Sequence, residues 1–371
     1  MDAFYAYVEL LRYPELCGQP VVIGGRGEHQ PVTLADGTRR FARLRDYAGR
    51  GVITTSTYEA RALGVHSAMG MMKAALLAPD AILLPVDFAA YRLYSRRFKA
   101  AVAEIAPRIE DRGIDEIYID LSDLADDSAT LGMRLKQAVR DATGLSCSIG
   151  ISPNKLLSKI ASDFDKPDGL TILAAGDLEG RIWPLPVRKI NGIGPRAAEK
   201  LCGIGIATIA QLAAADPALL QAEFGSSYAA WLHDAANGID ARPLVTDAEP
   251  KSVSRETTFE RDLHPKRDRS ELSAIFTDLC ERVAGDLRRK GYLARTIGIK
   301  LRYDDFRTLT RDVSLPGPTA DAATIRRAAG ECLRRVPLDR KLRLLGVRSS
   351  NLERAMQVPH GAAMDQTELP W

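Results

Sequence analysis

The chain has 371 residues, which is too long for one ordinary hydrophobic core and predicts two to four domains. Hydrophobic residues make up 46% and charged residues 27%, no long apolar run occurs, and no secretion signal is visible, so we expect a folded, soluble, cytoplasmic protein. Five scattered cysteines without a Cys-x-x-Cys pair predict reduced, buried thiols and argue against zinc.

Positive charge is concentrated in the C-terminal part of the chain. The formal net charge is +3, but residues 251–355 hold 24 Lys and Arg against 15 Asp and Glu, so they carry +9 and the remainder −6. A charge run is usually a solvated face, yet an excess of this size favours a polyanion as partner.

The N-terminal zone has α/β character. Residues 21–23, which two glycines follow, and residues 52–55 are β-branched, which predicts two short strands. Residues 58–63 and 89–105 have helical periodicity. A polar stretch from Arg26 to Arg50 contains six arginines against three acids. Its composition is that of a surface insertion or hairpin without catalytic consequence.

Two adjacent carboxylates, Asp115 and Glu116, follow this zone. They lie in Gly113–Asp120, whose β-branched and aromatic residues predict a strand. Desolvating two like charges is costly without a cation, so the pair favours a metal site over a charged turn. Neighbouring strand residues point to opposite faces, and two hard cations would therefore suit the pair better than one.

A helix at 129–143 and a strand at 146–151 complete this second zone. Strand, helix and strand with an acidic pair at a turn is the outline of a ferredoxin-like palm, which polymerases and nucleotide cyclases share.

The third zone, 181–240, is small and helical, and it contains a helix-hairpin-helix pattern at 190–201. Gly192 and Gly194 permit a tight turn, and Pro195 begins the next helix with free amides pointing outward. Such a hairpin either binds a phosphate through main-chain N–H groups or simply connects two helices; the Ala-Ala-Glu-Lys-Leu that follows favours phosphate.

A linker at 241–250 leads to the basic zone. Residues 296–303 alternate, which places Ile297, Ile299 and Leu301 inward and Lys300 and Arg302 outward, and residues 307–315 form a partner strand. Helices at 270–290 and 322–335 would cover the apolar face. A basic sheet backed by two helices suits a nucleic-acid backbone better than a small-molecule pocket.

The chain resembles the Y-family translesion DNA polymerases over nearly its whole length. The resemblance is carried by six motifs that occur in order: Met1–Glu9, Thr55–Arg61, Gly113–Asp120, Ser148–Lys155 with Lys159–Asp163, Ile190–Leu201 and Lys251–Glu256.

This resemblance implies an α+β multidomain fold shaped as a right hand. The palm is expected at 1–10 and 83–175, the fingers at 11–82 with the insertion at 26–50, and the thumb with its helix-hairpin-helix at 176–240. A linker at 241–251 leads to an α/β little finger at 252–355 and a flexible tail at 356–371. The implied reaction is template-directed, low-fidelity transfer from a dNTP to a primer 3′-hydroxyl, with two Mg²⁺ ions and without proofreading.

The resemblance assigns Asp115 and Glu116 to the metals and to catalysis, with Met1 contributing only its carbonyl and Asp2 a less central acid. The family has one more aspartate just before the position of Met1. We therefore expect the chain as written to lack a bridging carboxylate, and a longer form whose upstream residues end in Asp to be the active enzyme.

The resemblance also assigns the residues that contact substrates. Tyr5 matches the steric gate that excludes a ribose 2′-hydroxyl, although the residue alone fits an ordinary core tyrosine. The remaining assignments are the dNTP contacts Thr55, Tyr58, Arg61 and Lys159; the DNA-phosphate contacts Gly192, Gly194, Lys251, Ser254, Arg255, Lys300 and Arg302; and the sliding-clamp contacts Gln366, Leu369 and Trp371.

The expected partners are primer-template DNA, dNTPs and the sliding clamp, and the protein is expected to be a monomer. Two other classes stay open. A catalytically impaired paralogue acting as a DNA- and clamp-binding scaffold would explain a missing aspartate but usually loses the acidic pair. A nucleotide cyclase would need neither a helix hairpin nor a basic module.

Overall fold

The computed structural model describes residues 1–355, which form two compact units. The first runs from Met1 to Asp247 and the second begins at Ala248, so the division falls inside the predicted linker. Within residues 1–355, no helix is long and apolar enough to cross a membrane. Cys147, Cys280 and Cys332 are buried, whereas Cys17 and Cys202 are exposed, so the prediction of buried thiols is wrong for the last two.

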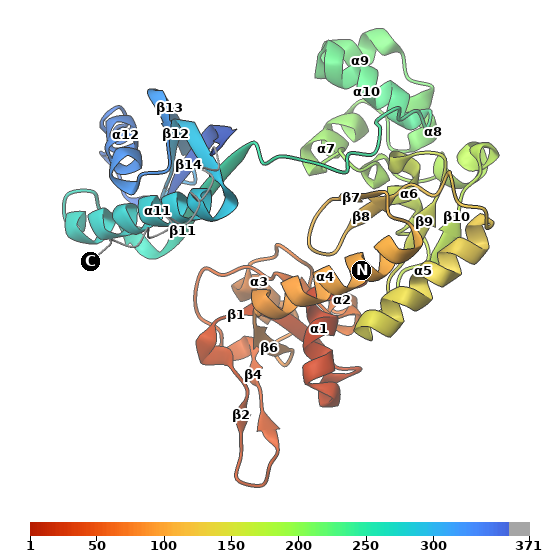
Figure 1. Cartoon of the computed structure of the whole chain (residues 1–371), viewed down its shortest axis with the longest axis horizontal. Coiled ribbons are helices and arrows are strands. Elements are labelled where there is room, and N and C mark those ends of the chain that lie inside the picture. Colours follow the sequence, from red (N-terminus) through yellow and green to blue (C-terminus); the bar gives the residue numbers. More distant parts are fainter. Residues whose placement is uncertain (356–371) are drawn as a thin grey trace, which may run out of the picture. The chain divides into compact units, whose positions relative to one another are not determined.

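The first unit begins with a four-stranded sheet in the order β4-β6-β1-β5 (Figure 1). Strand β1 is parallel to β6 and antiparallel to β5, and its three β-branched residues are completely buried. The predicted palm boundary at residue 83 falls inside β6, so a boundary after Pro85 fits the sheet better. The elements of this region are α1 (Phe4–Arg12), β1 (Val21–Gly25), β4 (Ala42–Arg43), β5 (Thr55–Ser56), α2 (Tyr58–Ala62), α3 (Met71–Leu77) and β6 (Ile82–Pro85).

The polar stretch 26–50 is partly a hairpin and partly core. Strands β2 (Val32–Thr33) and β3 (Arg39–Arg40) form a two-stranded ribbon that projects from the sheet (Figure 1). After β3 the chain returns to the sheet, where Leu44 and Tyr47 are buried. A deletion from Glu28 to Tyr47 would therefore remove core residues as well as the ribbon.

Next come two long helices, each started by an aspartate. Helix α4 (Phe88–Ile105) is capped by Asp87, and helix α5 (Ser128–Thr143) is capped by Asp127, whose side chains accept backbone N–H groups of the first turn. Helix α5 ends at Gly144 in the left-handed conformation, where glycine costs least.

The ferredoxin-like sheet appears as two separate pairs of strands. Strand β7 (Ile109–Asp111) pairs antiparallel with β8 (Ile117–Ile119), and β9 (Ile149–Ile151) pairs parallel with β10 (Leu170–Ile172). Both pairs pack on α4 and α5 through a shared apolar cluster. A cavity of about 610 Å³ separates β8 from β9, so each of these strands has one edge without a strand partner among the described residues.

The remainder of the first unit is helical and has its own core, built around buried residues such as Ile190, Leu201 and Leu232. Its helices are α6 (Lys155–Ala161), α7 (Pro195–Gly203), α8 (Ile209–Ala213), α9 (Pro217–Phe224) and α10 (Ser226–Ala236).

The second unit is one antiparallel sheet in the order β11-β14-β12-β13, covered on one face by two helices. The inward positions predicted on β12, including Ile297, Ile299 and Leu301, are buried against those helices, as expected from the alternation. The elements are β11 (Ser252–Leu263), α11 (Arg269–Lys290), β12 (Tyr292–Tyr303), β13 (Thr308–Thr319), α12 (Ala322–Arg334) and β14 (Leu342–Arg354).

Candidate active site

Asp115 and Glu116 lie in the connection between β7 and β8 and not within a strand. The side chain of Asp111 accepts the N–H of Gly113 at 3.0 Å, which turns the chain, and the strand begins only at Ile117. The prediction of a strand from residue 113 is therefore wrong at its start. Both carboxylates are half-buried. Because the connection is not a pleated strand, they are not forced onto opposite faces.

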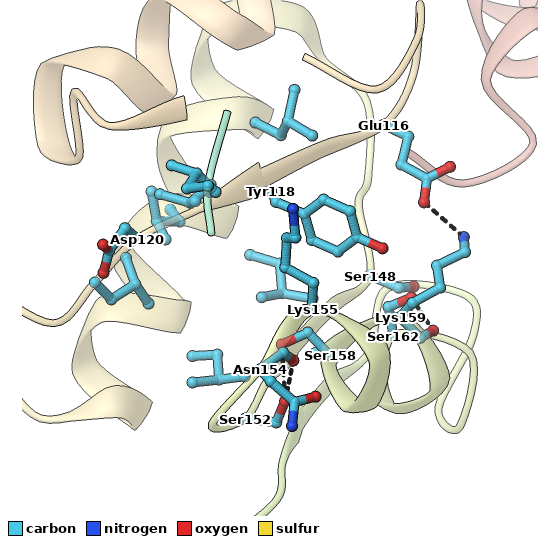
Figure 2. A pocket seen from close by; sticks show the side chains of 18 of the residues that line it. Glu116, Tyr118, Asp120, Ser148, Ser152, Asn154, Lys155, Ser158, Lys159 and Ser162 are labelled. Atoms are coloured by element: carbon cyan, nitrogen blue, oxygen red, sulfur yellow. Dashed lines mark hydrogen bonds and ion pairs between the residues drawn. The ribbon is translucent and has the colours of Figure 1, made fainter. Parts of the chain in front are cut away.

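Lys159 faces Glu116 of this pair. Its Nζ lies 3.0 Å from Glu116 Oε1, and Figure 2 shows the two side chains joined at one end of the cavity, with Asp120 at the far end of β8. Burial lowers the pKa of Lys159, but the hydrogen bond and charge of Glu116 oppose burial, and the net pKa is raised. The ammonium is therefore charged at neutral pH.

The first turn of helix α6, the helix that carries Lys159, is capped by two side chains. Asn154 accepts the N–H of Leu157 at 3.0 Å, and Asp240 accepts the N–H of Leu156 at 2.9 Å. The side-chain oxygen of Asn154 and the carboxylate of Asp240 thus accept backbone N–H groups of the first turn, and Asp240 lies 84 residues away in the sequence.

Met1 and Asp2 sit beside the acidic pair but in different roles. The terminal ammonium of Met1 donates to the backbone oxygen of Asp115 at 2.8 Å, and burial lowers its pKa. Asp2 is buried, and its carboxylate accepts from Ser146 Oγ at 3.0 Å, from Ser148 Oγ at 2.7 Å and from a backbone N–H. Asp2 thus ties α1 to the β9 region.

Three predicted dNTP contacts lie together around the start of α2. Thr55 is buried on β5, and the guanidinium of Arg61 lies 4.7 Å from the centre of the Tyr58 ring. Within residues 1–355, the Tyr58 hydroxyl is buried without a hydrogen-bond partner. Desolvation, followed by the charge of Asp2, raises the pKa of Tyr58 to about 12. A neutral hydroxyl that lacks a partner is suited to donate to a ligand oxygen.

Tyr5 lies on α1, half-buried and close to the acidic pair. Burial raises its pKa, and the charge of Asp115 raises it further. Tyr5 therefore lies within electrostatic range of Asp115, and its assignment as a steric gate stays a prediction.

The acidic pair fits a divalent cation that is completed by a substrate. Among the described residues no group of three or more His, Cys, Asp or Glu side chains could hold a metal ion. Asp115 and Glu116 nevertheless offer hard oxygen ligands, and Mg²⁺ is commonly held by one or two carboxylates together with water and substrate phosphates.

A second cavity, of about 480 Å³, shares Lys159 with the first and is lined also by Asp163, Arg188, Lys189 and Asn191. Arg188 and Lys189 are not among the residues predicted from the sequence. The available signal is a basic dipeptide directly before the helix hairpin, which places two cations beside the turn that is predicted to bind phosphate.

The helix hairpin has the geometry expected from its glycines. Gly192 has a φ of +118°, and a Cβ there would lie 2.6 Å from the Trp231 ring, so both its conformation and its surroundings require glycine. Gly194 precedes α7, whose first residue is Pro195. The amides of this first turn have no intrahelical acceptor.

The predicted DNA contacts of the second unit are not equivalent. Lys251 and Ser254 are exposed. Lys300 Nζ lies 2.8 Å from Glu256, and Arg302 Nε donates to Thr308 Oγ1 at 3.1 Å. Part of the surface of each of these four residues is therefore exposed to solvent.

Arg255 differs from them because β11 directs its side chain toward the helices, on the same face as Val253. Its Nε and Nη2 form hydrogen bonds of 2.6 and 3.0 Å with the Asp286 carboxylate. The pair anchors β11 to α11, and the phosphate contact of Arg255 stays a prediction. The predicted clamp contacts Gln366, Leu369 and Trp371 lie outside the described residues.

Solved structures share this fold. The structure titled "Y-family DNA polymerase chimera Dbh-Dpo4(243-245)-Dbh" matches with a TM-score of 0.77 and 24% identity, over 95% of this chain and 97% of that one. The structure titled "Insertion ternary complex of Dbh DNA polymerase" matches with a TM-score of 0.64 and 24% identity, over the same shares. The fold is therefore that of a Y-family DNA polymerase.

The sequence comparisons reach the same class. A family model described as "impB/mucB/samB family" matches residues 1–163, its C-terminal domain matches 250–363, and a SAM-like helix-hairpin-helix tandem matches 185–225. The protein is 41% identical to DNA polymerase IV of Methanoculleus marisnigri and 40% identical to that of Alkalilimnicola ehrlichii, each over 95% of this chain and 93% of the relative.

The chain belongs to the impB/mucB/samB family of Y-family DNA polymerases. It is accordingly a DNA-directed DNA polymerase of the translesion type that binds primer-template DNA and dNTPs, and its nucleotidyl transfer depends on a divalent metal. The predicted class and fold are confirmed, and the scaffold and cyclase alternatives are not favoured.

Proposed function

We propose that nucleotidyl transfer takes place at the β7–β8 connection, where Asp115 and Glu116 would hold two Mg²⁺ ions. The observation that carries this proposal is the half-buried acidic pair with Lys159 only 3.0 Å from Glu116. When bound, the ions would lower the pKa of the primer 3′-hydroxyl and neutralise the leaving pyrophosphate. Low fidelity and lack of proofreading belong to the same proposal, because the resemblance to translesion polymerases implies both.

The cationic and hydroxyl side chains around the pair would bind the triphosphate. Lys159 neutralises Glu116 in the free protein and, in this proposal, turns to the phosphates when a nucleotide enters. Tyr58 donates its hydroxyl, which has no hydrogen-bond partner among the described residues, and Arg61 supplies a charge held against the Tyr58 ring, with Thr55 beside them. Tyr5 would exclude a ribose 2′-hydroxyl.

The rest of the chain would hold DNA. We assign residues 1–10 and 86–175 to the palm, 11–85 to the fingers, 176–240 to the thumb and 252–355 to the little finger. The thumb hairpin would bind a phosphate through the amides after Gly192 and Gly194, and the open face of the second unit would bind the backbone through Lys251, Ser254, Lys300 and Arg302.

Single-nucleotide incorporation on a primed template tests the reaction. We expect extension that requires Mg²⁺, stops on chelation, and rises with the metal concentration in a sigmoidal manner as two ions bind. A hyperbolic dependence with one ion per site would contradict the two-metal assignment, and incorporation that ignores the template base would contradict the polymerase assignment.

The tail is proposed to dock on the sliding clamp through Gln366, Leu369 and Trp371, and the protein to act as a monomer. Truncation after Ala363 should abolish binding to immobilised clamp while leaving clamp-free primer extension unchanged. Unaltered clamp binding would refute the assignment. Light scattering at micromolar concentration should give a mass near the 40.5 kDa of one chain.

A further inference from the structure

A buried carboxylate stands behind Tyr5, and the site described above does not use it. Glu9 lies one helical turn beyond Tyr5 on α1 and is only 3% exposed. Its Oε1 accepts a hydrogen bond of 2.8 Å from the hydroxyl of Tyr91, a completely buried residue of α4. Burying a carboxylate costs free energy unless it is hydrogen-bonded, so the Tyr91 hydroxyl offsets part of the cost of burying Glu9.

The ring of Tyr91 is the surface on which Tyr5 rests. The two rings are stacked, with centroids 4.3 Å apart and an interplanar angle of 23°. Phe88 meets both rings edge-on, at 6.0 Å from Tyr5 and 5.8 Å from Tyr91. Such aromatic contacts have preferred geometries, and together they fix the plane of the Tyr5 ring.

The hydrogen bond between Tyr91 and Glu9 restrains a sliding motion that ring stacking alone permits. A stacked ring can still slide along its partner, but the Tyr91 hydroxyl is held at Glu9, which prevents Tyr91 from sliding. The second oxygen of Glu9 lies 3.9 Å from Arg12, which in turn donates to Asp87, the cap of α4, at 3.3 Å. Glu9 thus joins the start of α4 to the helix that carries Tyr5.

The Tyr91 hydroxyl is the donor in this hydrogen bond. Burial raises the pKa of Glu9 and outweighs the opposing effects of the Tyr91 hydrogen bond and the Arg12 charge, so the net pKa is raised. Tyr91 is neutral, because burial raises its pKa far above its ordinary value. The phenol therefore remains the donor and Glu9 the acceptor.

We propose that Glu9 and Tyr91 are positioning residues for sugar discrimination: Glu9 holds the Tyr91 ring, and this ring sets the plane of Tyr5 against the nucleotide sugar. The proposal rests on the proposed role of Tyr5 as the steric gate. Neither positioning residue touches the substrate. Loss of either should let Tyr5 tilt and admit a ribose without removing the gate itself.

The test is the ratio of kcat/KM for a dNTP to kcat/KM for the matching rNTP on one primed template. Tyr5→Ala should lower this ratio most. Tyr91→Leu, which removes the stacking, should lower it about threefold to tenfold, and Tyr91→Phe, which removes only the hydrogen bond, about twofold to fivefold. Glu9→Gln keeps an acceptor for the phenol and should retain the wild-type ratio, whereas Glu9→Leu should behave like Tyr91→Phe.

The outcomes separate the two proposals. If Tyr5→Ala changes the ratio but Tyr91→Leu and Tyr91→Phe lower dNTP and rNTP use equally, Tyr91 is only structural and the inference is wrong. If Tyr5→Ala leaves the ratio unchanged, the gate assignment fails and the inference fails with it. If Tyr91→Leu does not fold, Tyr91→Phe and Glu9→Leu still test the proposal. Tyr91→Phe keeps an aromatic ring in its buried position, and Glu9→Leu places an apolar side chain at the buried position of Glu9.

Discussion

Replacing Lys159 with methionine should separate substrate binding from stability. The side chains of Lys159 and Glu116 are 25% and 40% exposed, so their ion pair is worth no more than about 1 kcal/mol to folding. A charge-assisted contact to a triphosphate is worth about 1.5–3 kcal/mol, which corresponds to a change of about 10- to 150-fold. Methionine keeps most of the apolar stem and removes only the charge.

The assay is steady-state incorporation of one nucleotide together with thermal unfolding. We expect kcat/KM of Lys159→Met to fall about 10- to 150-fold, mainly through KM, while Tm changes by less than about 2 °C. Arg134→Met is a matched control, because it removes the exposed ion pair between Arg134 on α5 and Asp126, and neither residue lines the cavity. A kcat/KM within twofold of wild type, or an equal loss in the control, would refute the assignment of Lys159 to the triphosphate.

Three further predictions follow from other parts of the chain. Gly192→Ala should lower the free energy of unfolding by about 1–3 kcal/mol and weaken primer-template affinity, because its Cβ would meet Trp231; unchanged unfolding in urea would count against this geometry. Replacing Val32–Arg40 with a short Gly-Ser turn should leave Tm unchanged, since the ribbon lies outside the core, and altered lesion bypass would show that the ribbon has a role. The last prediction concerns an extended apolar segment added before Met1, which could pair with the free edges of β8 and β9 beside the acidic pair. A segment ending in aspartate should raise the rate of single-turnover incorporation at least about tenfold over the same segment ending in alanine. Equal rates would exclude that position for a metal ligand.

The bounds of the long helices were predictable because capping and helix-breaking residues mark their ends in the sequence. Helix α4 was expected at 89–105 and spans Phe88–Ile105, since Asp87 caps one end and Pro107 follows the other. Helix α11 stops before Gly291, which adopts the left-handed conformation. Local propensity and capping therefore determine these boundaries.

Short strands were less predictable because tertiary contacts decide them. The expected strand at 52–55 is reduced to β5, Thr55–Ser56, with Val52 in an isolated bridge. The strand expected from Gly113 starts four residues later, because the Asp111 side chain competes for the backbone. Such competition between side chain and ladder is not visible in a pattern of apolar residues.

The site was predictable where neighbours in the chain are neighbours in space. Tyr58 and Arg61 are three residues apart on one helix, and their contact could be anticipated. The Glu9–Tyr91 contact joins residues 82 positions apart, and the buried ion pair of Glu110 with Lys155, at 2.7 Å, joins residues 45 apart. No local pattern predicts such pairs.

The most direct test of the proposed metal site compares three substitutions in and next to the β7–β8 hairpin. Asp115→Asn and Glu116→Gln should each reduce Mg²⁺-dependent single-nucleotide incorporation by about a thousandfold, because each removes a charge from the proposed metal site. Asp120→Asn, at the other end of β8 and paired with Arg108 at 2.9 Å, should retain activity near wild type. Activity that survives in Asp115→Asn and Glu116→Gln, or that falls equally in Asp120→Asn, would contradict the assignment of the acidic pair as the catalytic centre.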